Sequence, residues 1–118
     1  MDMQLQGRTA LVTGASAGIG RGIAKALAAE GVRLCVSARR ADKLEEVAAE
    51  IVAAGGAALL LIVQDMLSAD AAERIAGAAL AGLGAVDILV NNAGGSRSFK
   101  ELHAGEDAWN EAIALNFH

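Results

Sequence analysis

Four short apolar runs, separated by stretches with helical periodicity, constrain the fold more than any other feature of the chain. The runs are residues 9–13, 34–37, 58–63 and 86–90. None of them alternates apolar and polar residues, which is typical of strands that are covered on both faces. Strands that alternate with helices in this way predict parallel β-α-β units with right-handed crossovers. We therefore expect an α/β fold with a doubly wound parallel sheet.

A glycine-rich segment joins the first predicted strand to the first predicted helix. Its sequence, Thr13-Gly-Ala-Ser-Ala-Gly-Ile-Gly20, places glycines at 14, 18 and 20. Glycine adopts positive φ angles and lets a ligand approach the backbone closely. The helix that follows begins with unpaired N–H groups at the positive end of its dipole. This position predicts a pyrophosphate-binding turn, and a tight turn without a ligand is the alternative.

The residues after the second predicted strand indicate which dinucleotide would bind. Sites selective for NAD usually place a carboxylate about 20 residues beyond the glycine turn, but here the sequence reads Ser37-Ala-Arg-Arg40. A guanidinium would pair with a 2′-phosphate, a contact that contributes about 1.5–3 kcal/mol. Arg39 and Arg40 therefore favour NADP(H) over NAD(H), whereas Asp42 is expected to interact with the dipole of the next helix. A solvated pair of arginines at a helix start is the alternative.

Polar residues also follow the third and fourth predicted strands. Asp65 comes just after the third run, and its carboxylate could accept a hydrogen bond from an adenine amino group. A loop aspartate is the alternative for this residue. The segment Asn91-Asn-Ala-Gly-Gly95 follows the fourth run and fits either the close passage of a ligand or an ordinary turn.

A last helix is predicted from near Gly105 to His118. In such a helix Trp109, Ile113 and Asn116 would share one face. An asparagine on an apolar face needs hydrogen-bond partners, because leaving it unpaired costs about 1–3 kcal/mol.

Composition argues against several other classes of protein. The chain has 10 Lys and Arg against 14 Asp and Glu, so its net charge of −4 makes nucleic-acid binding unexpected. Cys35 is the single cysteine, which excludes a disulfide framework and a cysteine-rich zinc site within one chain, and we expect no metal site. No apolar run reaches the roughly 18 residues of a membrane span, and the start MDMQLQGRTA lacks the pattern of a secretory signal. We expect a cytoplasmic protein that does not bind membranes.

TGASAGIG at 13–20, Asp65, NNAG at 91–94 and Asn116 after Trp109 together resemble the short-chain dehydrogenase/reductase family. The resemblance covers the whole chain and extends, in a general way, to bacterial 3-oxoacyl-carrier-protein reductases and related ketoreductases. It implies a Rossmann-type sheet with strand order 3-2-1-4. It also implies an NAD(P)-dependent oxidoreductase that transfers a hydride between nicotinamide and the carbonyl or alcohol carbon of a small substrate.

The resemblance implies roles for individual residues of the cofactor site. The positions expected to line the pyrophosphate and the nicotinamide side of the cofactor are Gly14, Ser16, Ala17, Gly18, Ile19 and Gly20. Those expected along the ribose, and in stabilising the central sheet, are Asn92, Ala93 and Gly94. Arg39, with Arg40, would hold the 2′-phosphate of NADP, and Asp65 and the backbone of Met66 would contact adenine. Ala17 stands where NADP-dependent members often have a basic residue, and this difference weakens the prediction of NADP.

The catalytic residues that the resemblance implies are present only in part. Asn116 would match the family's active-site asparagine, which bends its helix and positions a water in the proton relay. The family also needs a Tyr-x-x-x-Lys pair and a serine that follows this asparagine, but the chain contains no tyrosine and ends at His118. We expect residues 1–118 to be one dinucleotide-binding domain, the truncated amino-terminal half of a reductase that forms homodimers or homotetramers. The alternatives are a non-catalytic nucleotide-binding module and an inactive fragment.

Overall fold

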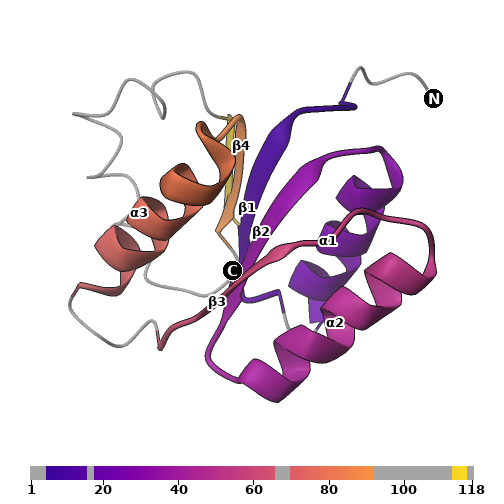
Figure 1. Ribbon diagram of the computed structural model, residues 1–118. Coiled ribbons are helices and arrows are strands. Elements are labelled where there is room, and N and C mark those ends of the chain that lie inside the picture. The colour runs from indigo at the N-terminus through magenta and orange to yellow at the C-terminus, as the bar shows by residue number, and fades with distance from the viewer. Residues whose placement is uncertain (1–4, 16–17, 66–69, 92–112, 117–118) are drawn as a thin grey trace.

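The computed structural model describes residues 5–15, 18–65, 70–91 and 113–116. One parallel sheet lies at the centre, with helices on both of its faces (Figure 1). In chain order the elements are β1 (Thr9–Thr13), α1 (Gly18–Ala29), β2 (Arg33–Ala38), α2 (Ala41–Ala53), β3 (Leu60–Val63), α3 (Ala71–Leu83), β4 (Ile88–Asn91) and β5 (Ile113–Asn116). The α/β fold expected from the alternating apolar runs is confirmed.

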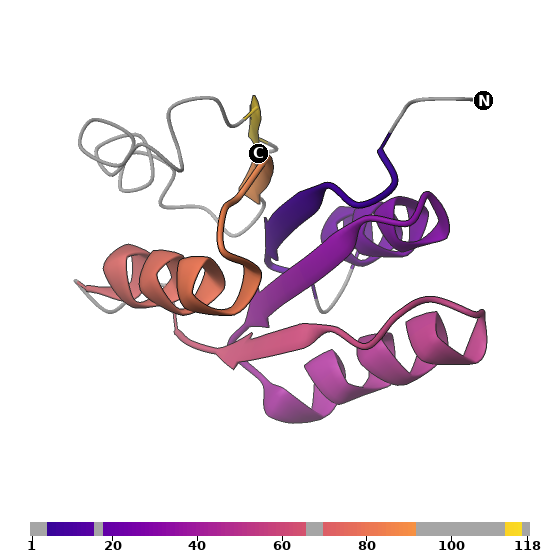
Figure 2. The same ribbon diagram turned by 45° about the horizontal axis from the view of Figure 1, so that its top comes forward.

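The strands lie in the order β3-β2-β1-β4-β5, and every neighbouring pair is parallel. The first four follow the predicted order 3-2-1-4. From β1 the chain builds outward through β2 and β3 on one side, and it then places β4 on the other side of β1 (Figure 2). This reversal is a topological switch point, and parallel sheets bind ligands at the carboxyl ends of the strands beside it.

Each face of β1 is covered by a different layer of helices. Ala10 and Val12 belong to a buried cluster that includes residues of α1 and α2, whereas Leu11 belongs to a cluster with residues of α3. All three side chains are fully buried. Because successive side chains of a strand point to opposite faces, a strand covered on both sides needs apolar residues throughout. The uninterrupted apolar runs of the sequence reflect this burial.

The helices pack on the sheet through small and aliphatic side chains. Helix α2 buries Leu44, Val47 and Ile51, which recur at helical spacing. Helix α1 buries Gly20 and Ala24, whose small size lets its backbone lie close to the sheet. In the described part of the chain, no helix has both the length and the apolar character needed to cross a bilayer.

Strand β3 differs from its prediction in length and in burial. It spans Leu60–Val63 rather than residues 58–63, and Leu61 and Val63 are 39% and 53% exposed. The expectation that both of its faces are covered is therefore wrong. The reason is position, because β3 lies at the edge of the sheet and has β2 as its only neighbour among the described strands. The composition of an apolar run does not show whether the strand lies at the centre or at the edge.

The end of the described chain forms a strand where the sequence predicts a helix from near Gly105. Ile113–Asn116 is β5, which pairs in parallel with the whole length of β4. The prediction that Ile113 and Asn116 share a helix face with Trp109 is wrong for the first two, and Trp109 lies outside the described residues. A short apolar run fits the period of a strand or of a helix. The second edge of β4 also needs backbone hydrogen-bond partners, which β5 supplies.

Candidate cofactor-binding site

The carboxyl ends of the strands bring distant parts of the sequence to one edge of the sheet. Thr13, the last residue of β1, is in register with Ser37 of β2 and with Asn91 of β4. Asn91 is in turn in register with Asn116 of β5. The glycine turn after β1, the arginines after β2 and the two asparagines therefore lie at the edge where parallel sheets bind their ligands.

The turn between β1 and α1 has a conformation that requires its glycines. Gly14 and Gly18 have φ angles of 65° and 59°, in the left-handed region that other residues rarely adopt. Between them, the amide of Ala15 donates a hydrogen bond of 3.1 Å to the carbonyl oxygen of Ser37. Ala15 is fully buried. These contacts fix the turn beside the switch point of the sheet.

Among the described residues, the space beside the first residue of α1 is open. Gly18 is its first residue, and a Cβ added there would meet no atom within 4 Å among the described residues. The first turn of α1 contains no acidic residue that would compete for its free N–H groups. Ile19 is 59% exposed beside this end, whereas Gly20 is buried. Free N–H groups at the positive end of a helix dipole suit an anion, so this end fits a pyrophosphate.

The side chain of Asn91 lies buried at the end of β4. Its Oδ1 is 3.2 Å from Oγ1 of Thr13, whose hydroxyl can donate to it. Its Nδ2 has no hydrogen-bond partner within the described ranges. A buried donor without a partner costs about 1–3 kcal/mol, so an acceptor from a ligand or a neighbouring loop fits here. The NNAG motif contains this asparagine, but sequence reasoning assigned the cofactor contacts to the residues after it.

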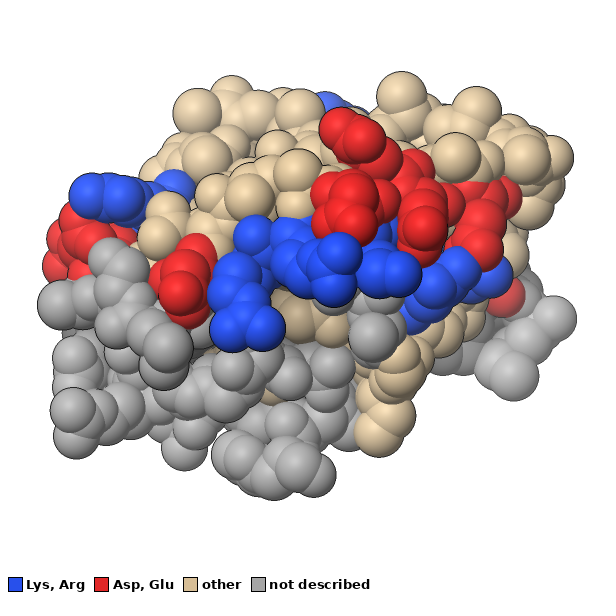
Figure 3. Space-filling model, turned by 90° about the horizontal axis from the view of Figure 1, so that it is seen from below, with Lys and Arg blue, Asp and Glu red and all other residues tan. Residues whose placement is uncertain are grey.

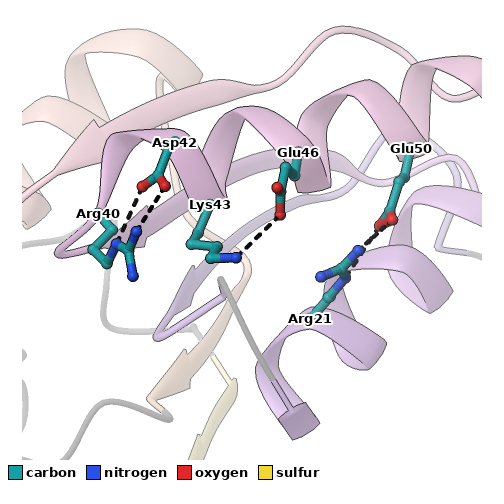
Figure 4. Close-up of polar contacts among 6 residues, drawn as sticks. All are labelled: Arg21, Arg40, Asp42, Lys43, Glu46 and Glu50. Carbon is teal, nitrogen blue, oxygen red and sulfur yellow. Dashed lines mark hydrogen bonds and ion pairs between the residues drawn. The ribbon is translucent and has the colours of Figure 1, made fainter.

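The two arginines that follow β2 differ in their contacts, although both are exposed. Nε and Nη2 of Arg40 donate hydrogen bonds of 3.2 and 2.8 Å to the carboxylate of Asp42 (Figure 4). These hydrogen bonds hold the pKa of the Asp42 carboxyl below its usual range. In the part of the chain that the structure describes, Arg39 forms neither a hydrogen bond nor an ion pair. The two guanidinium groups are therefore not equally available to a phosphate.

Ion pairs also connect the helices behind the glycine turn. Arg21 and Lys25 of α1 both pair with Glu50 of α2, and the hydrogen bond from Arg21 is the main reason that the pKa of Glu50 is lowered. Helix α2 adds a looser pair between Lys43 and Glu46, at 3.7 Å. Figure 3 shows that basic side chains form a row across the face where the strands end, with acidic side chains beside them. Helical periodicity alone did not predict these contacts between helices.

The sequence also matches a family of known proteins. The family model described as short chain dehydrogenase matches residues 8–118, which is nearly the entire chain. The chain belongs to the short-chain dehydrogenase family. Known structures of this family have the Rossmann-type sheet that the chain forms here.

Three members of the family illustrate the similarity. The 3-oxoacyl-[acyl-carrier-protein] reductase FabG of Escherichia coli is 39% identical over 115 residues, covering 97% of this chain and 45% of that protein. A metagenomic short-chain oxidoreductase in complex with NADP is 47% identical, with a TM-score of 0.71, over 76% of this chain and 40% of that one. A 7α-hydroxysteroid dehydrogenase complexed with NADH is 43% identical, with a TM-score of 0.71, over 77% and 35%. The chain thus spans less than half the length of each protein.

The described residues place part of the predicted site at this edge of the sheet. The predicted positions found there are Gly14, Gly18, Ile19, Gly20, Arg39, Arg40 and Asn116. The amide of Gln64 donates to the carbonyl oxygen of Ala38 at 3.0 Å, which brings the exposed Asp65 close to the end of β2. The predicted positions outside the described residues are Ser16, Ala17, Met66, Asn92, Ala93 and Gly94. The roles of all these residues stay predictions.

Proposed function

We propose that residues 1–118 form one dinucleotide-binding domain of an NAD(P)-dependent oxidoreductase. The observation that carries the proposal is the open amino-terminal end of α1, which begins at Gly18 beside the switch point of the sheet. Membership of the short-chain dehydrogenase family supports the same conclusion. The cofactor would exchange a hydride with the carbonyl or alcohol carbon of a small substrate, while the protein orients both molecules.

The glycine turn would hold the pyrophosphate, and neighbouring residues would hold the two nucleosides. The positions proposed to contact the pyrophosphate and the nicotinamide side are Gly14, Ser16, Ala17, Gly18, Ile19 and Gly20. Asp65 and the backbone of Met66 are proposed to contact adenine. Along the ribose we place Asn92, Ala93 and Gly94. The unpaired Nδ2 of Asn91 supports a ligand or loop acceptor at the same edge.

We infer that NADP(H) is preferred over NAD(H). The exposed Arg39, which has no partner among the described residues, supports this preference. Arg40 is predicted from the sequence to hold the same phosphate, but its guanidinium is paired with Asp42. At the end of β2, where NAD-selective sites usually carry an acid, this chain has Ala38. Ala17, in place of a basic residue, weakens the preference without reversing it.

Catalysis is proposed for the whole protein rather than for this chain alone. Asn116, in register with Asn91, is proposed to position a water for proton transfer. The chain contains no tyrosine, so it lacks the phenol that the family uses as proton donor. Assembly into homodimers or homotetramers and a cytoplasmic location stay predictions from the sequence.

Replacing Gly18 with valine tests the proposed pyrophosphate site. The substitution Gly18→Val places a branched side chain over the helix end, at a φ of 59° that such residues avoid. We expect NADPH and NADH to lose at least about ten-fold in affinity, since one lost charge-assisted contact accounts for that much. Isothermal titration of the chain with each dinucleotide measures this.

The matched control is Gly77→Val. Gly77 lies in α3, and a Cβ added there also meets no atom within 4 Å. We expect this variant to bind both dinucleotides like the wild type. Thermal unfolding of both variants separates loss of binding from loss of fold. Unchanged binding by a folded Gly18→Val variant would overturn the proposed site.

A further inference from the structure

The adjacent arginines at the carboxyl end of β2 have different electrostatic surroundings. Arg40 presents two of its nitrogens to both oxygens of Asp42, a bidentate pair between two exposed side chains that places a full negative charge against the guanidinium. Arg39 has no such partner among the described residues. The two cations and one anion of this segment leave a net charge of +1 rather than +2.

The pair between Arg40 and Asp42 forms within one short segment. Arg40 is the residue before the first turn of α2, and Asp42 lies in that turn, two residues further along the chain. Backbone hydrogen bonds from the amides of Asp42 and Lys43 also favour its ionised form. Because the two residues are only two positions apart, the pair requires no contact with any other element of the fold.

We propose that Asp42 is a specificity-determining residue that limits the affinity of this site for a 2′-phosphate. A phosphate that binds beside Arg39 meets repulsion from the Asp42 carboxylate, and it must compete with that carboxylate for Arg40. Arg39 then supplies most of the selectivity for NADP(H), and Arg40 contributes little while Asp42 is ionised. This inference rests on the proposed function, because it assumes that a dinucleotide binds at this edge.

Substitution of Asp42 by its neutral isostere tests the inference. We expect Asp42→Asn to bind 2′,5′-ADP about three- to ten-fold more tightly than the wild type, since an exposed guanidinium gains one charge-assisted contact. Binding of 5′-AMP, which lacks the 2′-phosphate, should change less than two-fold. Isothermal titration of the 118-residue chain with each probe measures both constants, and thermal unfolding shows that the variant is folded.

A double-mutant cycle tests whether Asp42 acts through Arg40. Arg40→Ala alone should weaken 2′,5′-ADP binding less than two-fold, whereas in the Asp42→Asn background it should remove most of the gain. The matched control is Glu46→Gln, which neutralises a carboxylate one turn further along α2, paired with Lys43 at 3.7 Å. This control should leave the ratio of the two affinities unchanged.

The outcomes separate this inference from the proposed function. If the wild-type chain binds NADPH and Asp42→Asn binds 2′,5′-ADP no more tightly than the wild type, the role of Asp42 is overturned and the cofactor site stands. An equal gain from Glu46→Gln would also overturn it, because the effect would then be general electrostatics. If the wild type binds neither NADPH nor NADH, the proposed function fails and the inference fails with it.

Discussion

Single side chains at the carboxyl edge of the sheet differ in what they offer to a ligand. Gly18 leaves open space beside the start of α1 among the described residues, and Asn91 offers a buried amide donor without a partner in the described part of the chain. The guanidinium of Arg39 has no partner among the described residues, whereas that of Arg40 is paired with Asp42. The residue types alone do not show these differences, because they depend on rotamers and neighbours.

Arg39→Ala tests the preference for NADP(H) at this scale. We expect the variant to lose roughly ten-fold or more in affinity for NADP, because a charge-assisted contact to the 2′-phosphate disappears. Affinity for NAD should stay nearly unchanged, since NAD has no phosphate at this position. Titration of both dinucleotides, with Arg33→Ala as a control at the opposite end of β2, measures the effect. Equal losses for NADP and NAD would contradict the assignment of Arg39.

Contacts between α1 and α2 affect the distance between the glycine turn and the arginines that follow β2. Glu50 of α2 binds Arg21 and Lys25 of α1, so one carboxylate joins the helix that begins at the glycine turn to the helix that follows the arginines. Exposed ion pairs contribute little to stability individually. Their more important effect here is on geometry, because they restrain α1 relative to α2.

Measuring Tm over a range of pH tests the ion pairs between α1 and α2. The pKa of Glu50 is lowered in the folded chain, mainly by its hydrogen bond from Arg21. Its stabilising effect is therefore present above the unfolded pKa and is lost as the pH falls through the folded pKa. We expect Glu50→Gln to lower the Tm slightly at neutral pH, and the difference from wild type to vanish at acidic pH. A difference that persists unchanged into acid would contradict this account.

The control for this series is Glu45→Gln. Glu45 is an exposed residue of the same helix and forms no ion pair within the described ranges. We expect its Tm to follow that of the wild type at every pH. A pH-dependent loss in this variant as well would show that the effect comes from the overall charge of α2.

The central strands could be predicted from the sequence, but the exposure of the edge strand β3 and the strand conformation of β5 could not. Residues 9–13 are apolar without alternation because both faces of β1 are buried, and the pattern records that burial directly. The exposure of β3 depends on its place in the sheet. The run Ile113–Asn116 is too short for its period to distinguish a strand from a helix.

The part of the candidate site that is encoded locally could also be predicted. The glycine turn is encoded locally, because its conformation requires glycine at 14 and 18. The contacts of Arg40 with Asp42 and of Arg21 with Glu50 depend on side-chain geometry across a turn or between helices. The spacing of residues along the sequence does not show which of these charges pair.

The charge of the whole molecule is distributed unevenly. Its net charge is −4, yet basic side chains form a row across the face where the strands end (Figure 3). A local positive potential attracts an anionic ligand even when the net charge is negative. Helix α1, the arginines after β2 and the switch point of the sheet meet at this same face. The molecule as a whole therefore presents one side suited to a dinucleotide.

The most direct test of this account is a titration of the ¹⁵N-labelled chain with NADPH, followed by amide NMR. We predict saturable shifts concentrated at the amides of Ala15, Gly18, Gly20 and Arg39, which lie along the carboxyl edge of the sheet. The amides of α3, on the far side of the sheet from α1, should move little. Saturable shifts confined to α3, or no shifts at millimolar NADPH, would contradict the claim that the glycine turn binds a dinucleotide.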